Sequence, residues 1–199
     1  MGGLIVDHQQ MEKLFIALYR LLLLGAIIGS IYSGYWLNLF VSSIAFILSF
    51  LPQFLSKRNY IVIPSGMQFI IITFIFASLY LGSLREYYHI FWWWDLMLHT
   101  LSGVILGFVG FILIYILNKD SNINVLLSPV FVALFSFTFA VTAGVFWELY
   151  EFAADIFLGL NMQKTGLTDT MWDLIVDCIG ASFASIIGYR YLTQDRPSY

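Results

Sequence analysis

Six long apolar segments dominate this chain, and they constrain its fold more than any single motif does. Each is close to the roughly 20 residues that a helix needs to cross a hydrocarbon core about 30 Å thick. Lipid offers a backbone no hydrogen-bond partner, so a helix, which satisfies its own N–H and C=O groups, is the default spanning structure. The sequence therefore predicts an all-α, polytopic membrane protein, with a single integral membrane domain over residues 1–199.

The breaks between the apolar segments give the expected ends of the helices. Proline, glycine and runs of polar residues mark these breaks, as at Pro52 and at residues 118–122. The six transmembrane helices are expected at about residues 14–31, 35–51, 61–81, 92–117, 125–152 and 170–192.

Charged residues are too scarce for a soluble domain. They make up 11% of the chain, against about a quarter in ordinary soluble proteins, while 60% of the residues are hydrophobic. Nine basic residues in a chain of net charge −3 form no basic stripe, which excludes a nucleic-acid partner. The lipid bilayer is the expected partner, and the sequence does not set an oligomeric state.

The basic residues predict the orientation in the membrane. If the N-terminus is inside, the outer segments contain only Arg85 and Lys164. The cytoplasmic segments then contain the other basic residues, namely Lys13, Arg20, Lys57, Arg58, Lys119, Arg190 and Arg196. By the positive-inside rule, the N- and C-termini are expected in the cytoplasm and the chain in the cytoplasmic (plasma) membrane.

The acidic residues gather at the opposite side. Eight of the twelve acids lie toward the outward ends of the last three helices, namely Glu86, Asp95, Glu148, Glu151, Asp155, Asp169, Asp173 and Asp177. Acids have little influence on topology, so orientation alone does not explain this clustering.

Two similar segments place pairs of ionisable residues one helical turn apart. Asp95 precedes His99 by four residues, and Asp173 precedes Asp177 by four. In each pair, the first residue is the Asp of a Trp-Asp-Leu sequence. Small residues continue these faces at four-residue spacing, beginning with Gly103, and such stripes let membrane helices approach closely. The pattern predicts that the acids converge below the outer surface.

Converging acids in a membrane need compensation. An ionised Asp near the bilayer centre costs on the order of 3 kcal/mol, and neighbouring carboxylates repel one another. Protonation, a bound cation or a water-filled cavity would each offset this cost. A set of carboxylates with one imidazole suits Mg²⁺, Mn²⁺ or Ca²⁺. Zn²⁺ is also possible, with a nitrogen of His99 as one of its ligands. The candidate metal ligands are Asp95, His99, Glu148, Glu151, Asp173 and Asp177.

Three of these residues are also candidate catalytic groups. They are His99, Glu148 and Asp173, with His99 or Glu148 as the general base. Plainer interpretations stay open: Asp169 and Thr170 could be N-cap residues of the last helix, and His99 could be a hydrogen-bonded core histidine. Glu151, with Asp155, could simply form a solvated helix end.

The order of these motifs resembles a known group of bacterial membrane proteins. Asp95-x-x-x-His99, then Glu148-Leu-Tyr-Glu-Phe and then Asp173-x-x-x-Asp177-x-x-Gly-Ala are similar to the YjdF-like integral membrane proteins, and more distantly to VanZ-like proteins. VanZ-like chains tend to have Asn where this chain has Asp177. The resemblance covers about residues 86–190 and implies a bacterial cytoplasmic-membrane protein; the VanZ-like part implies a link to envelope or glycopeptide response. Neither resemblance implies a particular chemical reaction for this chain.

Three functions are compatible with these residues. The first is an enzyme whose metal-assisted or acid/base site opens to the outer leaflet and acts on a lipid or cell-envelope precursor. The second is a transporter for protons, divalent cations or a small solute that uses the same acids. The third is a non-catalytic protein that binds a lipid, an antibiotic or a partner, with the acids forming a structural network.

Overall fold

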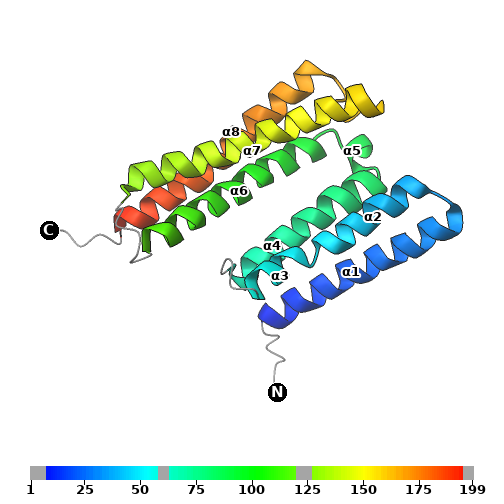
Figure 1. Cartoon of the computed structure of the whole chain (residues 1–199), viewed down its shortest axis with the longest axis horizontal. Coiled ribbons are helices and arrows are strands. Elements are labelled where there is room, and N and C mark those ends of the chain that lie inside the picture. The colour runs from blue at the N-terminus through cyan, green and yellow to red at the C-terminus, as the bar shows by residue number, and fades with distance from the viewer. Residues whose placement is uncertain (1–7, 58–62, 120–126, 195–199) are drawn as a thin grey trace. The chain divides into compact units, whose positions relative to one another are not determined.

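The computed structural model describes residues 8–57, 63–119 and 127–194, and every regular element within them is helical (Figure 1). The elements are α1 (His8–Ser33), α2 (Trp36–Leu48), α3 (Leu51–Lys57), α4 (Ser65–Ile75), the π-helix η1 (Phe76–Leu84), α5 (Tyr87–Ile90), α6 (Trp94–Lys119), α7 (Pro129–Leu158) and α8 (Leu167–Gln194).

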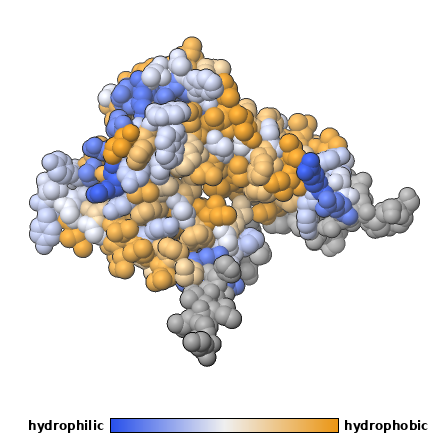
Figure 2. All heavy atoms as spheres, turned by 180° about the vertical axis from the view of Figure 1, so that it is seen from behind, coloured by the Kyte–Doolittle hydropathy of each residue, from blue (hydrophilic) through white to orange (hydrophobic). Residues whose placement is uncertain are grey.

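Six stretches of the described chain are long and apolar enough to cross a membrane, which confirms the predicted number. They are Gln9–Ser33, Trp36–Lys57, Ser65–Leu84, Trp94–Ile114, Pro129–Leu158 and Leu167–Gln194. On the face drawn in Figure 2, hydrophobic side chains cover much of the surface, and hydrophilic ones gather in separate patches. Many large apolar side chains are exposed in this way, which suits a surface solvated by lipid.

Several helix ends differ from the predicted ones. The predicted second helix is interrupted after Leu48, and Pro52 lies in the first turn of α3, where a missing N–H costs nothing. α7 continues to Leu158, so Asp155 is helical, and α8 begins at Leu167, three residues earlier than predicted. The predicted starts at residues 61 and 125 lie outside the described residues.

The chain forms two compact units, Met1–Trp94 (unit 1) and Asp95–Tyr199 (unit 2). In unit 1, α1 packs against α2 and α4, and α2 packs against η1. Its core contains large side chains. Phe76 of η1 stacks between Tyr19 and Tyr80, with ring centroids 4.3 and 4.7 Å away, and Leu23 is buried beside it.

Unit 2 is built instead on close backbone approach. α7 packs along α8, and glycines bring α6 and α8 together. A Cβ on Gly103 would lie 2.5 Å from the backbone oxygen of Asp177, and one on Gly180 would overlap the backbone oxygen of Thr100. The small residues expected to let the last three helices approach therefore do lie at their contacts.

Candidate functional site

The polar residues of unit 2 gather at the end where α7 joins α8. Asp95 lies in the first turn of α6, and His99 one turn later. Asp169 lies in the first turn of α8, and Asp173 and Asp177 follow on successive turns. The amino ends of both helices therefore point at carboxylates, which their dipoles favour. Glu148 completes this set, termed here the acidic cluster, from α7.

His99 lies at the centre of the acidic cluster. Its Nδ1 is 3.3 Å from Oδ2 of Asp177, while its Nε2 is 3.8 Å from Oε1 of Glu148 and 3.9 Å from Oδ1 of Asp95. The histidine is 7% exposed. Carboxylates from all three helices of unit 2 thus surround one imidazole.

Asp177 is fixed in place as the partner of the imidazole. The hydroxyl of Ser102 donates to its Oδ1 at 3.0 Å, and the carboxylate packs against Gly144, where a Cβ would overlap it. If the Nδ1–H of His99 donates to Asp177, then Nε2 faces Glu148 with its lone pair. A hydrogen bond of this kind commonly orients a metal-binding histidine.

Three buried residues bring one potential ligand atom each within 4.8 Å of one another: His99, Glu148 and Asp173, termed here the inner group. Glu148 is only 4% exposed, and neither of its carboxylate oxygens has a hydrogen-bond partner among the described residues. Thr170 and Gln163 are near enough to this carboxylate for weak hydrogen-bond contact, but neither makes a hydrogen bond of normal distance and angle with it.

A second set of the same size lies beside the first and shares Asp173 with it. This outer group consists of Asp95, Asp169 and Asp173. The Nζ of Lys164 donates to Oδ2 of Asp95 at 3.0 Å, and the backbone N–H of Lys164 donates to Oδ2 of Asp169 at 3.1 Å. The outer group therefore has a cation supplied by the chain, whereas the inner group has only His99.

The loop that carries Lys164 is held by Asp155. The backbone N–H groups of Met162 and Gln163 donate to the two oxygens of Asp155, at 2.7 and 2.9 Å. The side chain of Gln163 donates to the hydroxyl of Thr170 at 2.7 Å, which ties the loop to α8. Asp155 is therefore a loop anchor rather than part of a solvated helix end.

The structure brings together four of the six predicted ligands, namely Asp95, His99, Glu148 and Asp173. The other two lie beside these groups. Asp177 contacts Nδ1 of His99. Glu151 is near enough to interact electrostatically with Glu148, Asp95 and His99, and it accepts a hydrogen bond from Nε1 of Trp147 at 2.9 Å. Glu151 is 8% exposed, so the interpretation as a solvated helix end is wrong for it.

The sequence interpretation missed Asp169 and Lys164. Asp169 is not the N-cap of the last helix, because α8 begins two residues earlier and Asp169 belongs to the outer group. Its four-residue spacing from Asp173 was the signal that could have found it. No comparable signal marks Lys164, whose position depends on the conformation of the loop before α8.

The charges of the cluster are unbalanced. The five carboxyl groups of the acidic cluster, together with that of the neighbouring Glu151, accompany one imidazole and one ammonium group. Two unit charges about 4 Å apart interact by about 4 kcal/mol at an effective dielectric constant of about 20. Repulsion among ionised carboxylates at these distances is therefore substantial, and a divalent cation or shared protons would reduce it.

Six apolar helices with a buried polar cluster in their second half define a polytopic membrane protein. Residues 12–194 match the family described as "Predicted membrane protein (DUF2238)", and the chain belongs to this family. The match includes all six spans apart from a few residues at the start of the first.

An "Uncharacterized protein" of Thermotoga maritima is 30% identical over 145 residues, which cover 72% of each chain. No solved structure matches this chain. The family description gives the membrane as the setting and names no reaction.

Proposed function

We propose that the acidic cluster binds a divalent cation, and that the protein is a metal-assisted enzyme acting on a lipid or cell-envelope precursor. The observation that carries this proposal is the state of Glu148, which is 4% exposed with both oxygens lacking a hydrogen-bond partner. A buried carboxylate without such partners is costly unless a cation compensates it. Glu148 shares the inner group with His99 and Asp173, which supports a cation at that point.

The chain's own residues take distinct roles in this proposal. The ligands are Nε2 of His99 with the carboxylates of Glu148 and Asp173, a set that suits Mn²⁺, Mg²⁺ or Zn²⁺ better than a soft metal, with Ca²⁺ a further candidate. Asp177 orients the imidazole. The chemistry that a bound cation supplies is Lewis-acid catalysis.

Proton transfer then falls to another carboxylate. If His99 and Glu148 both bind the cation, neither is available as the general base that the sequence suggested. Asp95 has an 18% exposed side chain at the edge of the cluster, 3.9 Å from Nε2 of His99. It is therefore our candidate for the general base.

The setting supports a lipid-like substrate. Every residue of the inner group lies within a membrane span. Lys164, with a 27% exposed side chain beside Asp95, would attract an anionic part of such a substrate. We place the termini in the cytoplasm and the cluster toward the outer side of the cytoplasmic membrane, because seven of nine basic residues then lie inside. The more distant resemblance to VanZ-like proteins supports an envelope role.

The packing beside the cluster favours an enzyme over a transporter. Away from the cluster along α6 and α8, glycines leave no space between the helices: a Cβ on Gly107 would lie 2.6 Å from Cβ of Ala184. A transporter that used these acids would need a polar path through this contact. The third alternative is a purely structural hydrogen-bond network, in which Glu148 should have hydrogen-bond partners as Asp177 does. Asp177 accepts a hydrogen bond from Ser102, whereas neither carboxylate oxygen of Glu148 has a partner among the described residues.

Metal analysis tests the binding step. The protein would be purified without chelator, with Mn²⁺, Mg²⁺ and Zn²⁺ supplied, and its metal content measured by mass spectrometry beside His99→Ala and Asp173→Asn. We expect near-stoichiometric metal in the parent and its loss in both variants, while Glu12→Gln, the same kind of change in unit 1, retains it. Equal metal content in all four proteins, or none in the parent, would overturn the proposal.

Lipid analysis and flux assays test the reaction. A total bacterial lipid extract would be incubated with metal-loaded protein, and new species sought by mass spectrometry. An enzyme gives a product that Asp173→Asn fails to form. Metal-dependent ion flux into proteoliposomes without any lipid product would instead establish the transporter.

A further inference from the structure

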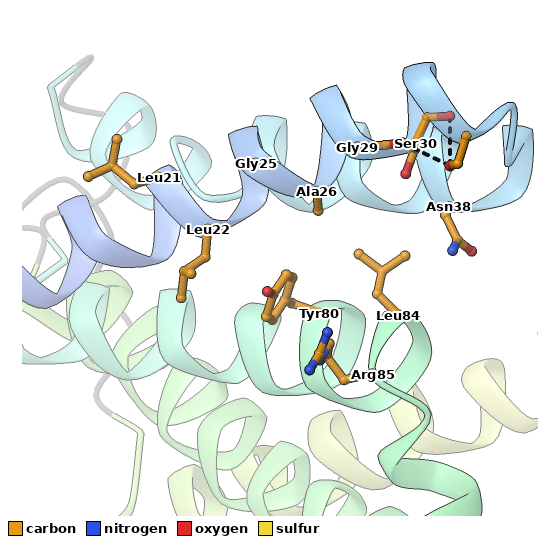
Figure 3. Close-up of a pocket in the computed structure, with 11 residues that line it drawn as sticks. Leu21, Leu22, Gly25, Ala26, Gly29, Ser30, Asn38, Tyr80, Leu84 and Arg85 are labelled. Carbon is orange, nitrogen blue, oxygen red and sulfur yellow. Dashed lines mark hydrogen bonds between the residues drawn. The ribbon is translucent and has the colours of Figure 1, made fainter.

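Unit 1 contains a groove of about 430 Å³ that the proposed function does not use (Figure 3). It lies between α1 and η1, with α2 contributing at one end. Leu21 and Leu22 line the apolar end, and the polar residues include Ser30, Asn38 and Arg85. A volume of this size is in the range of small-molecule sites.

Glycines leave the α1 wall of this groove open. A Cβ placed on Gly25 or on Gly29 would meet no atom within 4 Å. Elsewhere in the unit, α1 and η1 are held together by the stack of Tyr19 on Phe76. The groove therefore lies where glycine keeps one wall free of side chains.

Arg85 gives the groove a positive charge at the end of a span. It directly follows the span Ser65–Leu84, and Ser33, which also lines the groove, is the last residue of the span in α1. In the part of the chain that the structure describes, no carboxylate lies within ion-pair distance of Arg85. A guanidinium at a membrane interface next to an apolar groove complements an anionic phosphate group.

The length of the groove suits an acyl chain. From Leu21 to Ser33 along α1 is about 18 Å at ~1.5 Å per residue. One leaflet of a hydrocarbon core about 30 Å thick is about 15 Å deep. An acyl chain lying against Gly25 and Gly29 would thus place its headgroup near the level of Ser33.

The backbone beside the groove has an uncommon conformation. η1 is a π-helix from Phe76 to Leu84, and the N–H of Arg85 donates to the carbonyl of Tyr80, five residues earlier, at 2.9 Å. π-helical segments are rare and frequently occur at functional sites. Here the segment contributes Tyr80 and Leu84 to the groove and ends at the arginine.

We infer that this groove binds one anionic phospholipid, with an acyl chain against Gly25 and Gly29 and the phosphate at Arg85. This inference concerns unit 1 alone and does not depend on a metal in unit 2. Charge complementarity at Arg85 selects an anionic lipid over a zwitterionic one, whereas the open glycine wall gives space to an acyl chain.

The test is native mass spectrometry of the full chain with added phosphatidylglycerol or phosphatidylcholine of identical acyl chains. We expect roughly fivefold greater retention of phosphatidylglycerol, the effect of one basic residue near an anionic lipid. Arg85→Gln should abolish this preference, and Arg85→Lys should restore most of it. Gly25→Leu should reduce retention of both lipids, since its side chain would extend into the groove from a position where a Cβ meets no atom within 4 Å.

Matched controls separate the groove from general effects of charge and bulk. Lys57→Gln removes a basic residue elsewhere in unit 1, and Ala17→Leu enlarges an exposed residue of α1 outside the groove. Both should behave as the parent. Equal retention of the two lipids by the parent would overturn the inference, as would a loss of preference in Lys57→Gln equal to that in Arg85→Gln.

Discussion

The two units solve the same problem, holding three apolar spans together, with opposite kinds of residue. Unit 1 fills its interior with large side chains, and its buried core contains Leu23 and Phe76 beside stacked tyrosines. Unit 2 removes side chains instead, so that Gly103 and Gly180 bring backbones into contact. Lipid is as apolar as leucine, so dispersion contacts and close approach must provide the stability in both.

This difference explains why the acidic cluster lies in unit 2. Helices packed through glycine approach so closely that ionisable side chains of neighbouring helices come together, as Asp177 does with His99 beside Gly144. Bulky packing of the kind found in unit 1 would hold such groups apart. Close approach thus creates the charge repulsion that a bound cation would relieve.

The largest expected effect separates the two kinds of packing. Gly180→Ala places a methyl group on the backbone oxygen of Thr100 and should cost roughly 3 kcal/mol or more of unfolding free energy. Gly29→Ala in unit 1 meets no atom within 4 Å and should stabilise its helix by about 0.5–1 kcal/mol. Thermal unfolding in detergent measures both. Similar behaviour of the two variants would break the distinction between the units.

A smaller effect links this packing to metal binding. A methyl group at Gly144 would displace the carboxylate of Asp177 and so disturb the orientation of His99. Gly144→Ala should lower metal affinity about 10–100-fold, as expected when the partner of a ligating histidine is lost. Calorimetric titration with Mn²⁺ measures the change, with Gly29→Ala as the control. Unchanged affinity in folded Gly144→Ala protein would show that Asp177 does not orient the site.

The smallest expected effect is an increase in metal affinity. Lys164→Met removes the ammonium group 3.0 Å from Asp95 and should raise the affinity for a divalent cation about two- to fivefold. The same titration, repeated at high salt, should show this difference shrink because the pair is partly exposed. A fall in affinity would mean that Lys164 supports the cation site instead of competing with it.

Length and hydropathy predicted the six helices, because a membrane span allows few alternatives. Four-residue spacing also predicted the approach of Asp95, His99, Glu148 and Asp173, since helix geometry fixes which residues share a face. The π-helix was not predictable in this way, because its i to i+5 hydrogen bonds leave no periodic signature in an apolar run.

Other features depend on tertiary contacts that spacing does not encode. Spacing placed Asp177 among the candidate ligands but did not indicate its contacts with Ser102 and with Nδ1 of His99. Lys164 reaches Asp95 from a loop that Asp155 holds through two backbone N–H groups. Long-range pairs of this kind follow from the conformation of a loop, and the local sequence carries little information about it.

Pulsed electron paramagnetic resonance of Mn²⁺ bound to the purified protein tests the central claim most directly. A cation bound by Nε2 of His99 should show a nitrogen coupling, which His99→Ala removes and Glu12→Gln leaves intact. Mn²⁺ that shows no nitrogen coupling, or a coupling that persists in His99→Ala, would contradict a cation site built on His99, Glu148 and Asp173.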